Sequence, residues 1–155
     1  MTPPACSVGP LPQHKYNGET VLFLFQNLHR FTMYIAVGFI FVLYYDAFSA
    51  FFEGGHFLHG RLGVGVGSIV LLINATLLAG YTFGCHSLRH LIGGNLDCYS
   101  CDKQSQMRHG LWSKVSWLNG KHMLWAWMSR IWVGLSDVYV RLCSMGIIHD
   151  FNTWD

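Results

Sequence analysis

Long stretches without a charged residue constrain this chain more than any other feature. The segment from Phe31 to Tyr45 has no charged side chain in 15 residues, and the segment from Leu62 to Cys85 has none in 24. A helix rises about 1.5 Å per residue, so about 20 apolar residues cross a hydrocarbon core roughly 30 Å thick. Charged residues make up 12% of the chain, against about 25% in soluble domains. We therefore expect an integral membrane protein.

A third apolar segment covers about residues 122–145 and is interrupted by three charged residues, Arg130, Asp137 and Arg141. The predicted fold class is an all-α bundle of three transmembrane helices, with a loop rich in Cys and His between the second and the third. The helices are expected over about residues 20–50, 62–91 and 120–147. Residues 1–18 contain all four prolines and predict a flexible N-terminal arm, which leaves residues 19–155 as the anchor domain.

The distribution of Lys and Arg predicts the orientation. Residues 46–60 contain neither, whereas the segment from His86 to Lys121 contains Arg89, Lys103, Arg108, Lys114 and Lys121. Loops rich in Lys and Arg stay in the cytoplasm, so we place the 86–121 segment and the N-terminus there. Within that segment, residues 95–107 are expected to be mostly loop. Residues 111–118 are expected to lie at the membrane interface, with Trp112 and Trp117 at headgroup level.

Small residues open the second predicted helix. Gly63 and Gly67 have the spacing that lets two helix backbones approach closely in a membrane. No strand precedes them and no phosphate-binding Lys follows, so a nucleotide loop is not indicated. We interpret the pair as a helix-packing motif.

The densest group of candidate ligands lies in the predicted cytoplasmic segment. His86 and His90 are four residues apart, so both imidazoles project from one face if the helix continues through them. Cys98 and Cys101 form a C-x-x-C pair, and the intervening Gly93-Gly94 lets the chain fold back. These four residues predict a metal site, with Cys85 as an alternative thiolate ligand. A Cys98–Cys101 disulfide is disfavoured, because the cytoplasm is reducing.

Two metal centres suit that ligand set. One is a structural tetrahedral zinc, and the other is a Rieske-type [2Fe–2S] cluster with two Cys on one iron and two His on the other. Residue identities alone do not choose between them.

Polar residues inside the apolar helices form a second signal, because a charge at membrane depth costs at least about 2.5 kcal/mol. We interpret four of them as a quinone headgroup pocket: His29, Arg30, His122 and Arg130. The alternative is that they reach lipid phosphates. Asp137 and Arg141 are four residues apart and are expected to pair with each other.

Several of these residues belong to longer motifs. They are Phe25-Gln26-Asn27-Leu28-His29-Arg30, the run from Gly84 to Gly94, Asp97-Cys98-Tyr99-Ser100-Cys101, Ser116 to Asn119 leading to His122, and Asp137 to Leu142. Over about residues 20–150 the chain thereby resembles the cytochrome b-like membrane anchor subunit of actinobacterial-type succinate dehydrogenase or fumarate reductase, respiratory complex II.

The resemblance implies a multi-pass subunit in a bacterial plasma membrane that is not catalytic alone. In such a complex a flavoprotein oxidises succinate, an iron–sulfur subunit relays the electrons, and the anchor delivers them to menaquinone or ubiquinone. Some members resemble this chain in their Cys and His content and imply a Rieske-type cluster, which we map onto the four predicted ligands. Other members have Cys where this chain has Leu88. Related anchors often have five spans, so a higher oligomer or a further membrane chain is compatible with three.

Two alternatives stay open. Haem b held by two axial histidines would use His29 with His86, His90 or His122. A non-redox membrane scaffold would instead use the loop as a structural zinc site that holds a soluble partner. The small net charge of +2 gives no indication of nucleic-acid binding.

Overall fold

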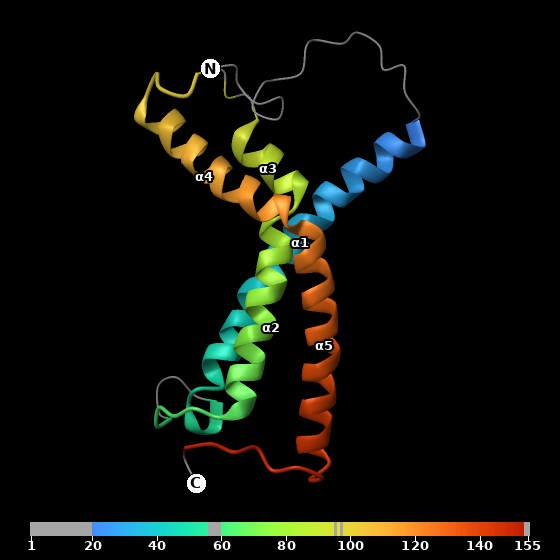
Figure 1. Cartoon of the computed structure of the whole chain (residues 1–155), viewed down its shortest axis with the longest axis vertical. Helices are drawn as coiled ribbons and strands as arrows, with labels where there is room; N and C mark the ends of the chain where they lie inside the picture. Colours follow the sequence, from blue (N-terminus) through green and yellow to red (C-terminus); the bar gives the residue numbers. More distant parts are fainter. Residues whose placement is uncertain (1–19, 56–59, 95, 97, 154–155) are drawn as a thin grey trace. The chain divides into compact units, whose positions relative to one another are not determined.

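The computed structural model describes residues 20–55, 60–94, 96 and 98–153. Within these residues the chain forms α1 (Thr20–Ser49), the short 3-10 helix η2 (Glu53–Gly55), α2 (Val66–Phe83), α3 (His86–Gly93), α4 (Lys103–Gly120) and α5 (His122–Ser144) (Figure 1). Only isolated β-bridges accompany the helices in this described part. The predicted all-α class is confirmed. The predicted N-terminal arm, residues 1–18, lies outside the described residues.

Two helices of the described chain are long and apolar enough to cross a membrane. They are Leu28–Ser49 within α1 and Val66–Phe83, which is all of α2. Only 17% and 22% of their most apolar windows are buried, whereas the core helix of a soluble protein would be mostly covered. Apolar side chains such as Phe31, Phe39 and Phe41 are therefore available to lipid. α5 is not among these candidate spans, and a third span stays a prediction.

The second predicted helix does not continue from residue 62 to residue 91. It begins at Val66 and ends at Phe83, and α3 starts separately at His86. Cys85 has an extended backbone, with φ −64° and ψ 138°. The Gly84 carbonyl accepts a 2.8 Å hydrogen bond from the Asn119 side-chain amide. This hydrogen bond satisfies the Gly84 carbonyl, so the helix can break there without leaving that carbonyl unpaired.

The segment predicted as loop up to residue 107 is also partly wrong, because α4 already begins at Lys103. Asp102 is its N-cap, and the Asp102 carboxylate accepts a 3.1 Å hydrogen bond from the Ser105 amide. This contact satisfies one of the amides that a helix start leaves without a partner. The capping residue Asp102 is visible in the sequence Asp-Lys-Gln-Ser, but the polar composition of the segment favoured the prediction of a loop.

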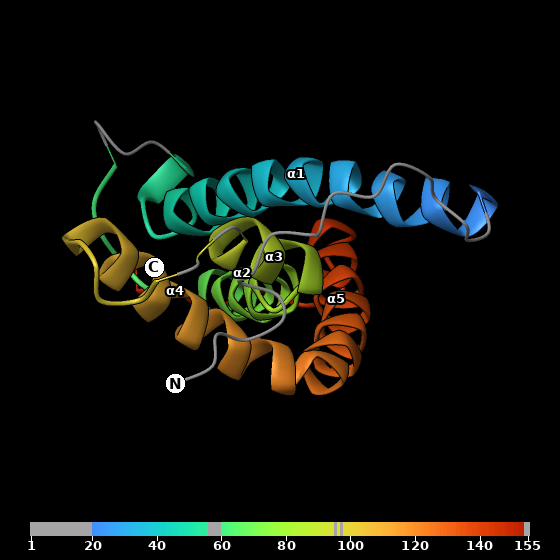
Figure 2. The ribbon, with the colours of Figure 1, turned by 90° about the horizontal axis from the view of Figure 1, so that it is seen from above.

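The chain divides into two compact units, residues 1–36 with 82–122 and residues 37–81 with 123–155. In the first unit α3 packs beside α4 (Figure 2). The Trp112 ring lies against Gly93, where a Cβ atom would overlap it. Arg108 donates hydrogen bonds to the Ile92 and Gly94 carbonyls, at 3.1 and 2.6 Å. Arg108 thus satisfies carbonyls at the end of α3.

In the second unit the C-terminal half of α1, α2 and α5 pack together. The Ser68 hydroxyl donates to the Ala50 carbonyl at 2.6 Å, and the Trp132 indole donates to the Val70 carbonyl at 3.1 Å. Small buried residues, Ala47 and Ala75 among them, allow the close approach. Gly80 makes room for the Trp125 ring, which a Cβ would approach to 2.7 Å.

The segment after α5 covers the start of α2. The Asp150 carboxylate accepts hydrogen bonds from the Gly67 amide at 2.9 Å and from the Tyr139 hydroxyl at 2.5 Å. A Cβ on Gly67 would lie 3.0 Å from Asp150 Oδ2. Gly67 was predicted to pack against a helix backbone with Gly63. In the structure Gly63 precedes α2, and Gly67 makes room for a carboxylate.

Candidate functional site

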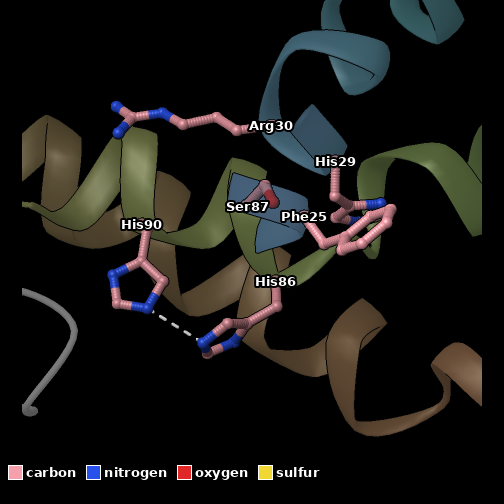
Figure 3. A pocket seen from close by; sticks show the side chains of 6 residues that line it. All are labelled: Phe25, His29, Arg30, His86, Ser87 and His90. Carbon is pink, nitrogen blue, oxygen red and sulfur yellow. Dashed lines mark hydrogen bonds between the residues drawn. The ribbon is translucent and has the colours of Figure 1, made fainter. Parts of the chain in front are cut away.

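A cavity of about 540 Å³ lies in the first unit, between α1 and α3. Figure 3 shows the six side chains that line it: Phe25, His29, Arg30, His86, Ser87 and His90. Three come from about one turn and a half of α1, and three come from the first five residues of α3. Both groups follow helical spacing, which places their side chains on one face of each helix.

The two α3 histidines form the most defined contact of the cavity. His86 Nε2 and His90 Nε2 are 2.8 Å apart, and the ring planes are nearly perpendicular, at 88° (Figure 3). The expectation that both imidazoles share one helix face is confirmed. At this distance one nitrogen donates its hydrogen and the other accepts it. The pair therefore holds one proton between its two Nε2 atoms.

Burial lowers the pKa of His90, and the neighbouring His86, Arg89 and Arg30 lower it further through charge repulsion. Both effects disfavour the charged imidazolium. The neutral form of the His90 ring is therefore favoured, and the tautomers of the two rings decide which Nε2 donates.

His29 connects the cavity to the helix break. Its Nε2 lies 3.2 Å from the Sγ of Cys85, which is a buried free cysteine. Cys85, the alternative thiolate ligand, thus contacts His29. Arg30 is exposed at the cavity wall. Arg89 lies instead with its guanidinium 4.9 Å from the centre of the Trp112 ring.

Cys98 and Cys101 form a disulfide, with their Cα atoms 5.8 Å apart. This corrects the expectation that the pair would be reduced thiolates. The C-x-x-C turn brings both sulfurs within bonding distance of each other, and that same proximity makes the pair attractive as metal ligands. Within the described residues, no group of three or more His, Cys, Asp or Glu side chains is arranged to hold a metal ion. The predicted four-residue set is therefore not assembled in the structure.

The other two predicted quinone residues are not among the side chains that line this cavity. His122 is the first residue of α5. Arg130 lines a smaller pocket of about 200 Å³ in the second unit, with neighbours that include Tyr81 and Ser129. The expected pair of Asp137 and Arg141 is confirmed, with 2.8 Å between Arg141 Nε and Asp137 Oδ2.

Sequence reasoning missed Phe25 and Ser87 as lining residues. Phe25 precedes His29 by four residues, so helical spacing alone places it on the same face. Ser87 directly follows His86 at the start of α3. Both signals were present, but the break at Gly84 and Cys85 was needed to show which face of α3 meets α1.

Comparison with known proteins supports a family assignment. Residues 1–146 match the family described as actinobacterial succinate dehydrogenase subunit SdhC. The chain is also similar to a chain of the solved Mycobacterium smegmatis Sdh1 complex in the apo form, with 40% sequence identity and a TM-score of 0.71. That similarity covers 88% of this chain and 49% of the other, so this chain spans about half the length of that relative. No curated protein matched.

The family match covers nearly all of the chain, including every residue of the cavity and both candidate spans. The chain belongs to the family of actinobacterial succinate dehydrogenase membrane subunits SdhC, as its motifs predicted.

Proposed function

We propose that this chain is the membrane anchor of a succinate:quinone oxidoreductase and that it binds the quinone headgroup in the cavity between α1 and α3. The observation that carries the proposal is the convergence of His29 and Arg30 with the His86–His90 pair around one space. These side chains supply N–H donors from two helices. A cavity of about 540 Å³ is in the range of small-molecule sites, roughly 300–1,000 Å³.

The donors suit the chemistry of quinone reduction. A quinone takes up two electrons and two protons, and negative charge develops on its carbonyl oxygens during the reaction. The Arg30 guanidinium keeps its charge and stabilises such an oxygen. The His86–His90 pair offers a proton held at Nε2. Phe25 provides an aromatic face for the quinone ring.

The position of the cavity along α1 suits a lipid-soluble substrate. His29 and Arg30 lie at the start of the candidate span that begins at Leu28. Directly after them along α1, apolar side chains such as Phe31 and Ile35 are exposed. A quinone could thus keep its headgroup among the polar residues and its isoprenoid tail beside the apolar surface.

The family assignment supports a role within a larger complex. In this proposal a flavoprotein subunit oxidises succinate, and an iron–sulfur subunit passes the electrons to the anchor in the plasma membrane. The Lys and Arg distribution supports a cytoplasmic position for residues 86–121, and hence for α3 and α4, together with the N-terminus. α5 would then supply the third span, with its charges partly neutralised by the Asp137–Arg141 pair.

The Rieske-type cluster does not fit the described arrangement. It requires two thiolates and two imidazoles, whereas Cys98 and Cys101 are bonded to each other. A structural zinc on the same four ligands meets the same obstacle. For haem b, His29 would have to exchange its 3.2 Å contact with Cys85 for an iron ligand. The proposed function therefore includes no electron-transfer step at a metal centre of this chain.

Metal analysis of the purified complex tests whether this chain holds a metal centre. Iron with acid-labile sulfide, beyond the content of the iron–sulfur subunit, would show that Cys98 and Cys101 are reduced in the membrane and that the four ligands assemble. A Soret band would identify haem. Zinc at one per chain would support the scaffold alternative.

The quinone site is tested by Arg30→Gln in the assembled complex. We expect succinate:quinone activity to fall about tenfold or more, because a hydrogen bond from a charged donor is lost. Succinate oxidation with a soluble artificial acceptor should be unchanged, since that reaction bypasses the anchor. Arg61→Gln is the matched control, because Arg61 is paired with Glu53 away from the cavity lining. Equal quinone activity in the Arg30 and Arg61 variants would overturn the assignment.

A further inference from the structure

The outer face of α4 and its C-cap carry a row of lysines that no described residue neutralises. Lys103 and Lys114 are 11 residues apart, close to three whole turns, so they align on one side of α4. Lys121 is the C-cap of the helix, and its ammonium lies over the Trp117 ring on the same side. α4 contains no Asp or Glu. Among the described residues none of the three lysines forms an ion pair. An anionic surface from outside the chain is the natural complement of this row.

The opposite face of α4 is fixed on the first unit. Val115 is buried, Trp112 lies against Gly93, and Arg108 bonds the end of α3. Trp112 had been expected at headgroup level, but its ring is partly covered by these contacts. Trp117, by contrast, is 59% exposed on the lysine side. Because the packing fixes the rotation of the helix, the lysine row must face outward.

A hydrogen bond joins α4 to the residue that directly follows the second candidate span. The candidate span Val66–Phe83 is about 27 Å long, close to the thickness of a hydrocarbon core. Gly84 directly follows that span, and its carbonyl accepts the Asn119 amide at 2.8 Å. Asn119 is therefore held at the edge of the hydrocarbon.

A pocket of about 440 Å³ lies on α4 within two turns of Asn119 and is lined by Ser113, Lys114, Trp117 and Leu118. It combines an ammonium, a hydroxyl and an indole over an apolar floor. The Lys121 ammonium lies 4.3 Å from the centre of the Trp117 ring, which holds a second positive charge at the pocket rim. Two cations beside a tryptophan are suited to a phosphate group at a membrane interface.

We infer that α4 binds an anionic phospholipid of the adjacent leaflet, with its phosphate at Lys114 and Lys121 and its glycerol and upper acyl region against Trp117 and Leu118. The acidic face of a soluble protein is the competing occupant. The position of Asn119 and the apolar pocket floor favour the lipid, because a headgroup and its acyl chain match both features. This site is separate from the proposed quinone site, since the two pockets share no lining residue.

Native mass spectrometry of the full-length chain in detergent tests the inference, with phosphatidylglycerol and phosphatidylcholine as the two probes. The wild-type chain should retain phosphatidylglycerol preferentially. The double variant Lys114→Gln/Lys121→Gln should lose about thirtyfold in phosphatidylglycerol affinity, given the usual effect of two lysines at an anionic surface. Phosphatidylcholine binding should change little. Lys114→Arg/Lys121→Arg keeps both charges and should keep the preference.

Arg61→Gln is the control for removal of a positive charge elsewhere. Hydrogen exchange locates the effect: added phosphatidylglycerol should slow exchange of the amides of residues 113–121 in the wild type and not in the Gln variant. Equal affinity of the wild type for both lipids would overturn the inference. So would protection of α4 that requires added soluble subunits and is independent of lipid, since that result would identify a protein partner.

Discussion

The Tyr139 hydroxyl donates a 2.5 Å hydrogen bond to the Asp150 carboxylate, which also accepts the Gly67 amide. Asp150 thereby joins α5 to the first turn of α2 across 83 residues of sequence. A carboxylate at a helix start satisfies a free amide and interacts favourably with the helix dipole. The contact thus gives α2 an N-terminal cap that comes from a distant part of the chain.

Asp150→Ala should destabilise the start of α2 by about 1 kcal/mol, the usual effect of losing a capping side chain. Hydrogen exchange at the Gly67 amide is the measurement, and it should accelerate. Asp137→Ala is the matched control, because it removes an exposed carboxylate on α5 whose partner is Arg141. If both variants leave the Gly67 amide equally protected, Asp150 is not its partner in the membrane.

Gly67→Ala should also open this contact, because the added Cβ would lie 3.0 Å from Asp150 Oδ2. The carboxylate must move, and the expected result is a lower midpoint of thermal unfolding. Gly134→Ala provides the comparison, since its Cβ would meet nothing within 4 Å. Alanine has the higher helix propensity, so Gly134→Ala should be neutral or stabilising. A higher midpoint for Gly67→Ala would mean that Asp150 does not contact Gly67.

Gly93→Ala should separate α3 from α4, because its Cβ would overlap the Trp112 ring. Overpacking of this kind costs about 1–3 kcal/mol. The change should appear as stronger quenching of Trp112 fluorescence by an aqueous quencher. The Trp112→Phe variant gives the fluorescence of the other tryptophans, which is subtracted. Gly110 lies on α4 near Trp112, and a Cβ there would meet nothing within 4 Å, so Gly110→Ala should leave quenching unchanged. Identical quenching in the two alanine variants would contradict the packing of Trp112 on Gly93.

The N-cap of α4 predicts a dependence on acidic pH. Hydrogen bonds from Ser105 lower the pKa of Asp102 below its usual value of 3.8. A carboxyl with a lowered pKa in the folded state stabilises that state above the unfolded pKa, and the effect disappears as pH falls through the folded pKa. The first turn of α4 should therefore fray below about pH 4. Exchange of the Ser105 amide, corrected for its intrinsic pH dependence, measures this.

Asp102→Asn tests the same cap without a titrating group. The Asn oxygen still accepts from Ser105, so the pH dependence should vanish while the cap persists. A variant that frays at the same pH as the wild type would exclude Asp102 as the cause.

Hydropathy alone predicted the helical class and the bounds of α1 within a residue. Of the three spans that it predicted, two are candidate spans in the described structure and the third stays a prediction. The spacing of His86 and His90 predicted their shared face, because both lie within one short helix. The break between Phe83 and His86 was not predictable from local pattern. It depends on Asn119, 35 residues away, which takes the Gly84 carbonyl.

The metal prediction shows a different limit. Cys98 and Cys101 have a spacing that serves a metal and a disulfide equally well, and residue identity does not report the oxidation state. Arg130 was grouped with His29 because both are polar residues in apolar segments. Both residues are polar and lie in apolar segments, but the pocket that each one lines depends on the rotation of its helix. Phe25 was overlooked for the converse reason, since an aromatic residue in an apolar helix carries no signal by itself.

The break at Gly84 and Cys85 allows the sequence of α2 to change in evolution without changing the orientation of the histidine pair. In one continuous helix, any change in the rotation of α2 against its neighbours would turn His86 and His90 by the same angle. An extended residue between the helices removes that coupling, so the rotational phase of the imidazoles is set by α3 and α4. Substitutions that adapt α2 to a different lipid environment or a new helical neighbour can then accumulate without reorienting the histidine pair. The second candidate span and the histidine pair of this chain are in that sense free to evolve independently.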